Sequence, residues 1–150
     1  MKNKIRKQIE LMNSSIRKTN AIYGQWAKKF GLSFNSLMVL YTIDETPGCT
    51  QKQISQSWLI PKQTVHTILM DFSRKGYIEF NTDNDDRREK TVRFTENGRR
   101  YASSILSRLY YIEEMAMEKL GEETRFQLVD SNIKYCDTLI ETFNQEVQNE

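Results

Sequence analysis

The spacing of the apolar residues changes at Gly76, and this change limits the folds open to the chain. Before Gly76 the apolar residues fall at helical steps, at Val65, Ile68, Leu69 and Phe72. After it they alternate with other residues, at Ile78 and Phe80 and again at Val92 and Phe94. Alternation is typical of strands. The pattern predicts a helix that ends near Gly76, followed by a β-hairpin with a polar loop from Asn81 to Glu89.

A second, shorter helix precedes this one. Thr50 and Gln53 have the spacing of a capping box, which satisfies two free amide groups at a helix start. The helix is only about two turns long, and Ile54 and Leu59 are expected to face inward. Pro61 suits the start of the next helix, since its fixed φ fits the first turn. Together these signals predict a helix-turn-helix.

The flanking segments also read as helices. Gly31 ends the first helix, Ser33 can cap the next, and Pro47 with Gly48 ends that one. Its expected apolar face consists of Phe34, Leu37, Met38 and Tyr41. Thr95 is expected to cap a long helix that reaches Leu120. That helix runs through Ile105, Leu109 and Ile112, and Gly121 separates it from the last helix.

Both ends of the chain carry a seam of apolar residues at steps of three and four. The N-terminal seam is Ile5, Ile9, Met12, Ile16, Tyr23, Trp26 and Phe30. The C-terminal seam is Phe126, Val129, Ile133, Cys136, Ile140, Phe143 and Val147. Each seam could pack within its own subunit. Two terminal helices without a core of their own instead favour an intertwined homodimer, because a monomer would leave much apolar area in water.

The charges are distributed unevenly. Residues 1–30 carry eight Lys or Arg against the single acid Glu10, whereas residues 101–150 carry four bases against ten acids. This asymmetry suggests that the terminal segments pair electrostatically and leave a basic surface for an anionic partner.

Several classes of protein are disfavoured by the sequence. No apolar run approaches the roughly 20 residues that span a bilayer, so we expect a cytoplasmic protein without a membrane partner. Cys49 and Cys136 share no metal-type spacing and are expected to be reduced thiols. No nucleophile-base arrangement, metal quartet or phosphate loop is recognisable, and His66 is the single histidine. We therefore expect no enzyme, no catalytic residues, no metal and no cofactor.

The outward side of the second helix of the helix-turn-helix carries residues that can donate to phosphates or pair with base edges. The predicted DNA-binding residues on this helix are Lys62, Gln63, Thr64, His66, Thr67 and Arg74. A solvated helix face would look the same. The hairpin that follows favours double-stranded DNA as the partner, because its polar loop is expected to project as a wing.

The wing adds Arg87, Arg88 and Lys90 to the predicted DNA-binding residues. An arginine at such a tip can enter the minor groove, and neighbouring acids can hold it in position. A charged loop that only confers solubility is the alternative reading.

The wing also carries a specific resemblance. Asp86, Arg87 and Arg88, followed after a strand by the segment Phe94, Thr95, Glu96, Asn97 and Gly98, resemble the wing signature of the MarR family of bacterial transcriptional regulators. Residues 64–78 are similar to that family's recognition helix where it enters the first wing strand. The order of elements agrees over nearly the whole chain.

The resemblance implies a homodimer with interlocked terminal helices and two winged lobes on a pseudo-palindromic operator, usually as a repressor relieved by a ligand or an oxidant. It makes Arg88 the minor-groove arginine and Asp86 its supporting partner. Members that sense peroxide have a reactive cysteine in the first helix, which this chain lacks, and zinc-responsive members use several histidines. Both kinds of sensing are therefore disfavoured.

Small aromatic effectors often bind between the dimer helices and the winged lobe in this family. Tyr23, Trp26, Phe30 and Tyr41 could line such a cleft, although aromatic residues at helical spacing are more often core.

The sequence thus predicts a mostly α fold with a small β-hairpin wing. Residues 31–99 form the winged helix-turn-helix, and residues 1–30 and 100–150 form a helical dimerisation region. The expected function is a DNA-binding regulator, with a small ligand as a candidate modulator. The alternative is a winged-helix protein-interaction module that has lost DNA binding.

Overall fold

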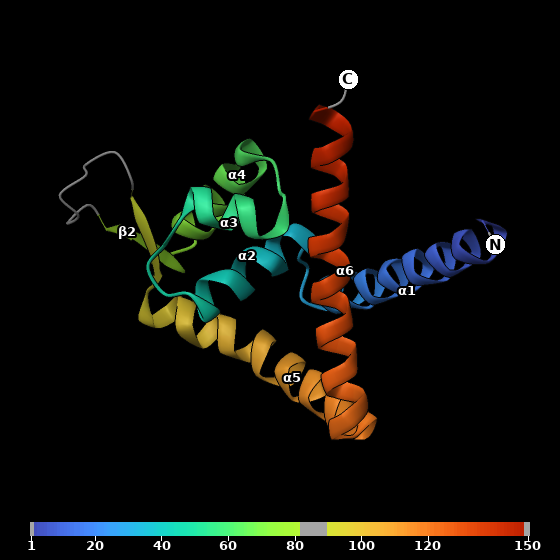
Figure 1. The fold of residues 1–150 in the computed structure, drawn as a ribbon. Helices are drawn as coiled ribbons and strands as arrows, with labels where there is room; N and C mark the ends of the chain where they lie inside the picture. The colour runs from blue at the N-terminus through green and yellow to red at the C-terminus, as the bar shows by residue number, and fades with distance from the viewer. Residues whose placement is uncertain (1, 82–89, 149–150) are drawn as a thin grey trace. The chain divides into compact units, whose positions relative to one another are not determined.

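The computed structural model describes residues 2–81 and 90–148, and most of them are helical (Figure 1). The elements are α1 (Lys2–Lys29), α2 (Phe34–Glu45), β1 (Cys49–Thr50), α3 (Gln51–Trp58), α4 (Lys62–Arg74), β2 (Ile78–Asn81), β3 (Thr91–Phe94), α5 (Glu96–Leu120) and α6 (Glu122–Gln148). This order confirms the mostly α fold with a hairpin wing, and it adds β1. The chain divides into two compact units, Met1–Ser107 and Arg108–Glu150. Each unit is described by itself.

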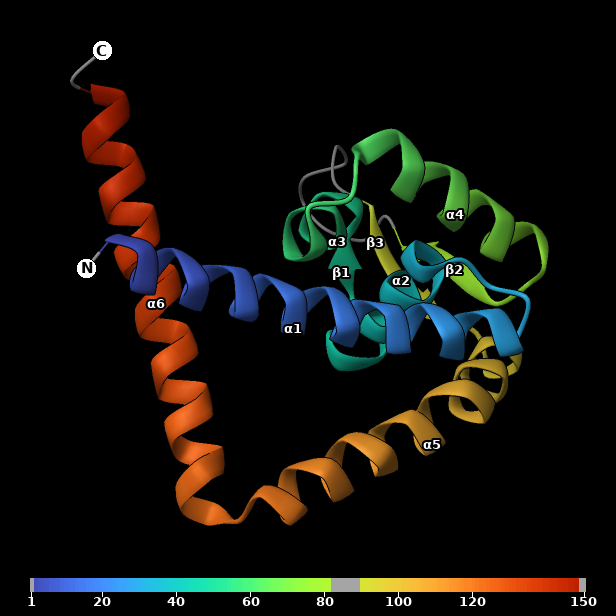
Figure 2. The same cartoon turned by 90° about the vertical axis from the view of Figure 1, so that its right-hand side faces the viewer.

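Helix α2 is the centre of the first unit. It contacts α1, α3, α4 and β3, and Figure 2 shows α1 running alongside it. The sequence predicted a single apolar face, which was wrong. The structure buries residues around most of the helix, namely Leu37, Met38, Val39, Leu40, Thr42 and Ile43, while Phe34 and Tyr41 are only half-buried. A helix surrounded by other elements can be apolar on every side.

The predicted capping box of α3 is confirmed. The Thr50 hydroxyl accepts from the Gln53 amide at 3.2 Å, and the Gln53 side chain accepts from the Thr50 amide at 2.8 Å. The prediction that Leu59 faces inward is wrong. Leu59 ends α3 in the left-handed region with φ 52° and is 89% exposed, whereas Ile60 is buried. The left-handed residue turns the chain, so the next side chain points into the core.

Helix α4 has the predicted stripe and ends. Val65, Leu69 and Phe72 are buried, Ile68 is half-buried, and Gly76 follows the helix with φ +70°. Pro61 occupies the position just before the first helical residue, one place earlier than the sequence suggested.

The strands form a three-stranded antiparallel sheet in the order β1-β3-β2. The hairpin of β2 and β3 was predicted. Strand β1 was not, because two residues are too short to show a period. Cys49 pairs with Val92 and Thr50 with Thr91, so β1 joins the start of α3 to the base of the wing.

The start of α5 is fixed against the end of α4. As predicted, the Thr95 side chain caps this helix: its hydroxyl accepts from the Gly98 amide at 2.9 Å and donates to the Gly76 carbonyl at 2.6 Å. Gly98 lies so close to Tyr77 that a Cβ at this position would fall 1.7 Å from the Tyr77 carbonyl oxygen. The Tyr77 and Tyr101 rings stack with centroids 4.1 Å apart.

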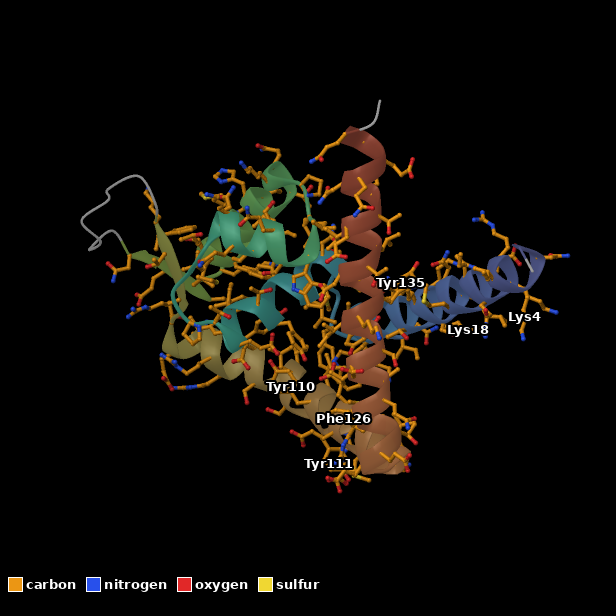
Figure 3. All side chains as sticks on the ribbon, viewed as in Figure 1. Lys4, Lys18, Tyr110, Tyr111, Phe126 and Tyr135 are labelled. Carbon is orange, nitrogen blue, oxygen red and sulfur yellow. The ribbon has the colours of Figure 1, made fainter. Side chains whose placement is uncertain are left out.

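The second unit consists of the end of α5 and the whole of α6, which meet at Gly121 with φ +76°. Tyr110, Tyr111 and Phe126 lie near this corner (Figure 3). No described residue of α6 is buried. Neither α6 nor any other helix in the described part of the chain is long and apolar enough to span a membrane.

Candidate nucleic-acid interface

Helix α4 presents most of its predicted DNA-binding residues to solvent. Lys62, Gln63, His66 and Thr67 are exposed, and Thr64 is half-buried. The Thr67 hydroxyl donates to the Gln63 carbonyl at 3.0 Å within the helix, and its oxygen can still accept from a ligand. The buried stripe on the other side holds the helix against the core, so the polar face is presented outward.

The N-terminal half of α4 borders a hollow of about 540 Å³. We call it the basic hollow, and it is lined by Thr50, Gln51, Lys52, Lys62, His66, Met70, Ser73, Phe80 and Lys90. Three lysines and the histidine come from three places: α3, α4 and the residue just before β3. Since no carboxylate occurs among these described lining residues, the hollow favours an anionic ligand.

Lys52 and Gln51 belong to this site, and neither was predicted from the sequence. They lie in the first turn of α3, which the sequence marks only as a short capped helix. Gln51 Nε2 donates to the Lys62 carbonyl at 3.1 Å, and Gln51 Oε1 lies 3.4 Å from His66 Nδ1. Only the packing of α3 on α4 brings these residues together, so no sequence signal could have indicated them.

Arg74 lies apart from the other predicted residues of α4. It is the last residue of the helix, twelve positions after Lys62 and so roughly 18 Å along the axis. Its guanidinium lies 3.6 Å from the Asp71 carboxylate. Lys75 also pairs with Asp71, at 2.7 Å, and this hydrogen bond raises the pKa of Lys75 above its ordinary value. Arg74 is not among the residues that line the basic hollow.

The predicted wing residues divide into two groups. Lys90 is exposed and lines the basic hollow. Asp86, Arg87 and Arg88 lie outside the described residues, so their roles stay predictions.

The four aromatic residues of the predicted effector cleft fall into separate contacts. Trp26 packs on Phe30 with centroids 5.4 Å apart, and its indole N–H donates to the Ile105 carbonyl at 3.1 Å. Tyr41 instead packs edge-on against Trp58, whose indole donates to the Thr42 hydroxyl at 2.9 Å. Tyr23 is half-buried. An effector cleft between these residues stays a prediction.

The two cysteines have different surroundings. Cys49 is buried, and burial raises the pKa of its thiol, which disfavours the reactive thiolate. Cys136 is exposed on α6. In the part of the chain that the structure describes, no group of three or more His, Cys, Asp or Glu is placed to hold a metal ion.

A helix-turn-helix followed by a hairpin, with a basic hollow at the junction, defines a winged-helix protein. Residues 30–89 match the sequence profile of the MarR family, which confirms the resemblance drawn from the wing and recognition-helix motifs. No curated protein matches the chain.

Solved structures extend the likeness to nearly the whole chain. A MarR family regulator from Neisseria meningitidis is 24% identical with a TM-score of 0.80, over 93% of this chain and 98% of that one. A MarR transcriptional regulator from Methanosarcina mazei is 19% identical with a TM-score of 0.67, over 91% and 99% of the two chains. In a complex of MepR from Staphylococcus aureus with DNA, the protein is 21% identical with a TM-score of 0.70, over 86% and 94%. The fold is therefore the MarR fold.

Proposed function

We propose that this chain is a sequence-specific DNA-binding transcriptional regulator that acts as a homodimer. The observation that carries the proposal is the basic hollow, where Lys52, Lys62, His66 and Lys90 meet beside the exposed face of α4. Lysines suit the phosphate backbone and a polar helix face suits base edges, so one surface offers both kinds of contact. The match of residues 30–89 to the MarR family and the DNA complex of a similarly folded protein support the same function.

The terminal helices supply the surface for dimerisation. All seven residues of the C-terminal seam are exposed on α6, with Phe126 at 72% and Phe143 at 65%. On α1, Ile5 and Ile16 are exposed as well, whereas Ala27 near its C-terminal end is buried. An apolar stripe of this length is unusual on a monomer. A second copy of the chain is the partner we propose.

Charge supports the pairing of α1 with α6 of the other protomer. Lys4 and Lys18 extend from α1 (Figure 3), and their helix carries Glu10 as its single acid. Helix α6 begins with Glu122 and Glu123 and carries an excess of acids along its length. Because opposite charges lie beside the two apolar stripes, contact of α1 with α6 is favoured over contact of each helix with its own copy.

Selection of bound DNA from a random pool tests DNA binding and symmetry together. We expect a palindrome with half-sites about one helical turn apart, since a two-fold dimer places its two α4 helices on successive turns of one face. An enrichment of single, unrelated half-sites would contradict the dimer. Recovery of no sequence at low salt would contradict DNA binding and would favour the protein-interaction alternative.

Lys62→Ala tests the basic hollow. The variant should bind the selected operator more weakly. The slope of log K against the logarithm of the salt concentration should be smaller in magnitude by about 1, because one phosphate contact is lost. Lys119→Ala, which removes an exposed charge from the end of α5, is the matched control and should leave the slope unchanged. Equal slopes for the Lys62 variant and the unchanged protein in a salt titration would place the interface elsewhere.

We propose that the protein represses transcription and that a small aromatic effector relieves this repression. The support is the family resemblance and the aromatic residues at the end of α1, of which Trp26 and Phe30 form a pair. Release of operator DNA on titration with phenolic acids, lost in Trp26→Ala, would support an effector site. No release with such compounds would contradict it.

A further inference from the structure

Gln51 connects the two helices of the helix-turn-helix at the residues that face the basic hollow. It is the first residue of α3, directly after the Thr50 cap. Its side-chain nitrogen donates to the Lys62 carbonyl at 3.1 Å, and its oxygen lies 3.4 Å from His66 Nδ1. Lys62 and His66 are one helical turn apart on the same face of α4, so a single amide contacts both.

The first contact fixes the orientation of the amide. A backbone carbonyl can only accept a hydrogen bond, so the nitrogen of Gln51 must face Lys62 and the oxygen must face His66. The oxygen can only accept as well. His66 Nδ1 must therefore carry a proton to complete the second contact, which leaves Nε2 of the neutral ring without one. The neutral imidazole is then an acceptor at Nε2.

We propose that Gln51 is a positioning residue for base recognition, which holds the His66 ring so that Nε2 accepts a hydrogen bond from an amino group in the major groove. The amino groups exposed there belong to cytosine N4 and adenine N6, whereas guanine presents only acceptors. His66 is exposed beside Lys62, Lys52 and Lys90, which suit the neighbouring phosphates. This inference rests on the proposed DNA-binding function.

The tautomer can be measured without DNA. His66 is the single histidine of the chain, so the imidazole nitrogen resonances of the ¹⁵N-labelled protein need no assignment. At a pH where the ring is neutral, we expect the Nδ1–H form to dominate. Gln51→Met keeps the bulk of the side chain but removes both polar atoms, and it should abolish this preference. A dominant Nε2–H form in the unchanged protein, or the same tautomer in both proteins, would overturn the proposal.

The base preference is measured on the selected operator by changing each base pair in turn. The unchanged protein should prefer cytosine or adenine over guanine at one position of each half-site, and His66→Ala should lose this preference. Gln51→Met removes the acceptor for Nδ1–H, so the ring is no longer held with Nε2 as its acceptor. The preference at that position should then fall by about five- to tenfold, the effect of one hydrogen bond.

The controls separate positioning from a merely structural role. Gln56→Met makes the same change of side chain at an exposed position of α3 and should leave the preference unaltered. In a His66→Ala background Gln51→Met should have no effect on base preference. If it still shifts the preference there, Gln51 acts independently of His66 and the inference fails. Failure to select any operator would refute the proposed function instead, while the tautomer measurement would still decide the Gln51–His66 contact.

Discussion

Leu59 and Ile60 are neighbours in the sequence with opposite surroundings. Leu59 is 89% exposed and has φ 52°, a backbone conformation that disfavours side chains with a Cβ. Ile60 is 4% exposed, and the Ser55 hydroxyl donates to its carbonyl at 2.7 Å. One apolar residue is therefore strained at the surface, while the next one anchors the turn between α3 and α4.

Substitution of each residue should change stability in opposite directions. Leu59→Asn should raise the free energy of unfolding by about 0.5–1 kcal/mol, because asparagine tolerates the left-handed region and little packing is lost. Ile60→Ala should lower it by about 2–4 kcal/mol through loss of buried area and a cavity. Urea unfolding monitored by circular dichroism measures both. A destabilised Leu59→Asn would mean that the leucine is covered in the native assembly.

Gly98 is required by a close backbone contact. Its own φ is not in the left-handed region, but a Cβ would overlap the Tyr77 carbonyl at 1.7 Å. The Tyr77 carbonyl accepts from the Thr95 amide at 3.0 Å, so it cannot move away without breaking the contact that seats α5.

Gly98→Ala should therefore destabilise the protein by at least about 2–3 kcal/mol, at the upper end of overpacking effects, because a backbone atom must shift. Asn97→Ala, at the exposed neighbouring position, should change stability by no more than about 0.5 kcal/mol. Thermal unfolding of the two variants in parallel gives the comparison. Equal melting temperatures would mean that α5 and Tyr77 are not in contact.

Among the elements, α3 is the shortest helix in the described part of the chain and depends most on its first turn. Eight residues make a marginal helix by themselves, so tertiary contacts and capping must stabilise it. Thr50 does this in two ways: its side chain caps the helix, and its backbone belongs to β1.

Thr50→Val keeps the β-branched shape and removes the cap. We expect a loss of about 1 kcal/mol in the free energy of unfolding, together with faster amide exchange in the first turn of α3. Thr67→Val removes a hydroxyl whose hydrogen bond to the Gln63 carbonyl lies within α4, and it should cost less than about 0.5 kcal/mol. Hydrogen exchange by mass spectrometry resolves the local effect. Unchanged exchange in α3 would show that β1 pairing alone fixes this turn.

At the scale of the whole molecule, we expect part of the stability to come from a second copy of the chain. The first unit has its own core around α2, whereas α6 has no buried residue among those described. A helix of this length with an exposed apolar stripe gains stability chiefly by packing.

Phe143→Glu should therefore give a monomer without unfolding the first unit, because the side chain is 65% exposed in the single chain. Thr138→Glu makes a similar change on the opposite, polar side of α6 and should leave the dimer intact. Sedimentation equilibrium at micromolar concentration distinguishes the two. A dimeric Phe143→Glu protein would show that the seam is not the interface.

Much of the fold could be read from the sequence because its signals are local. Helix ends at Gly31, Gly76 and Gly121, the Thr50 cap and the alternation in the hairpin depend on residues within a few positions of each other. Such signals survive in any tertiary context that allows the element to form. The exposed side of α4 followed from the same periodicity.

Contacts between distant segments were decided only by the tertiary structure. Cys49 pairs with Val92, and the Gln51 amide lies between Lys62 and His66. Both contacts join elements that a local pattern treats separately. The outward turn of Leu59 was likewise decided by the tertiary structure. A local pattern shows whether a segment is a helix or a strand, but it does not show which other element packs against it. The packing partner determines which polar groups form hydrogen bonds. The sequence alone thus determined the helices, the two hairpin strands and their order, whereas packing determined β1 and the shape and chemistry of the basic hollow.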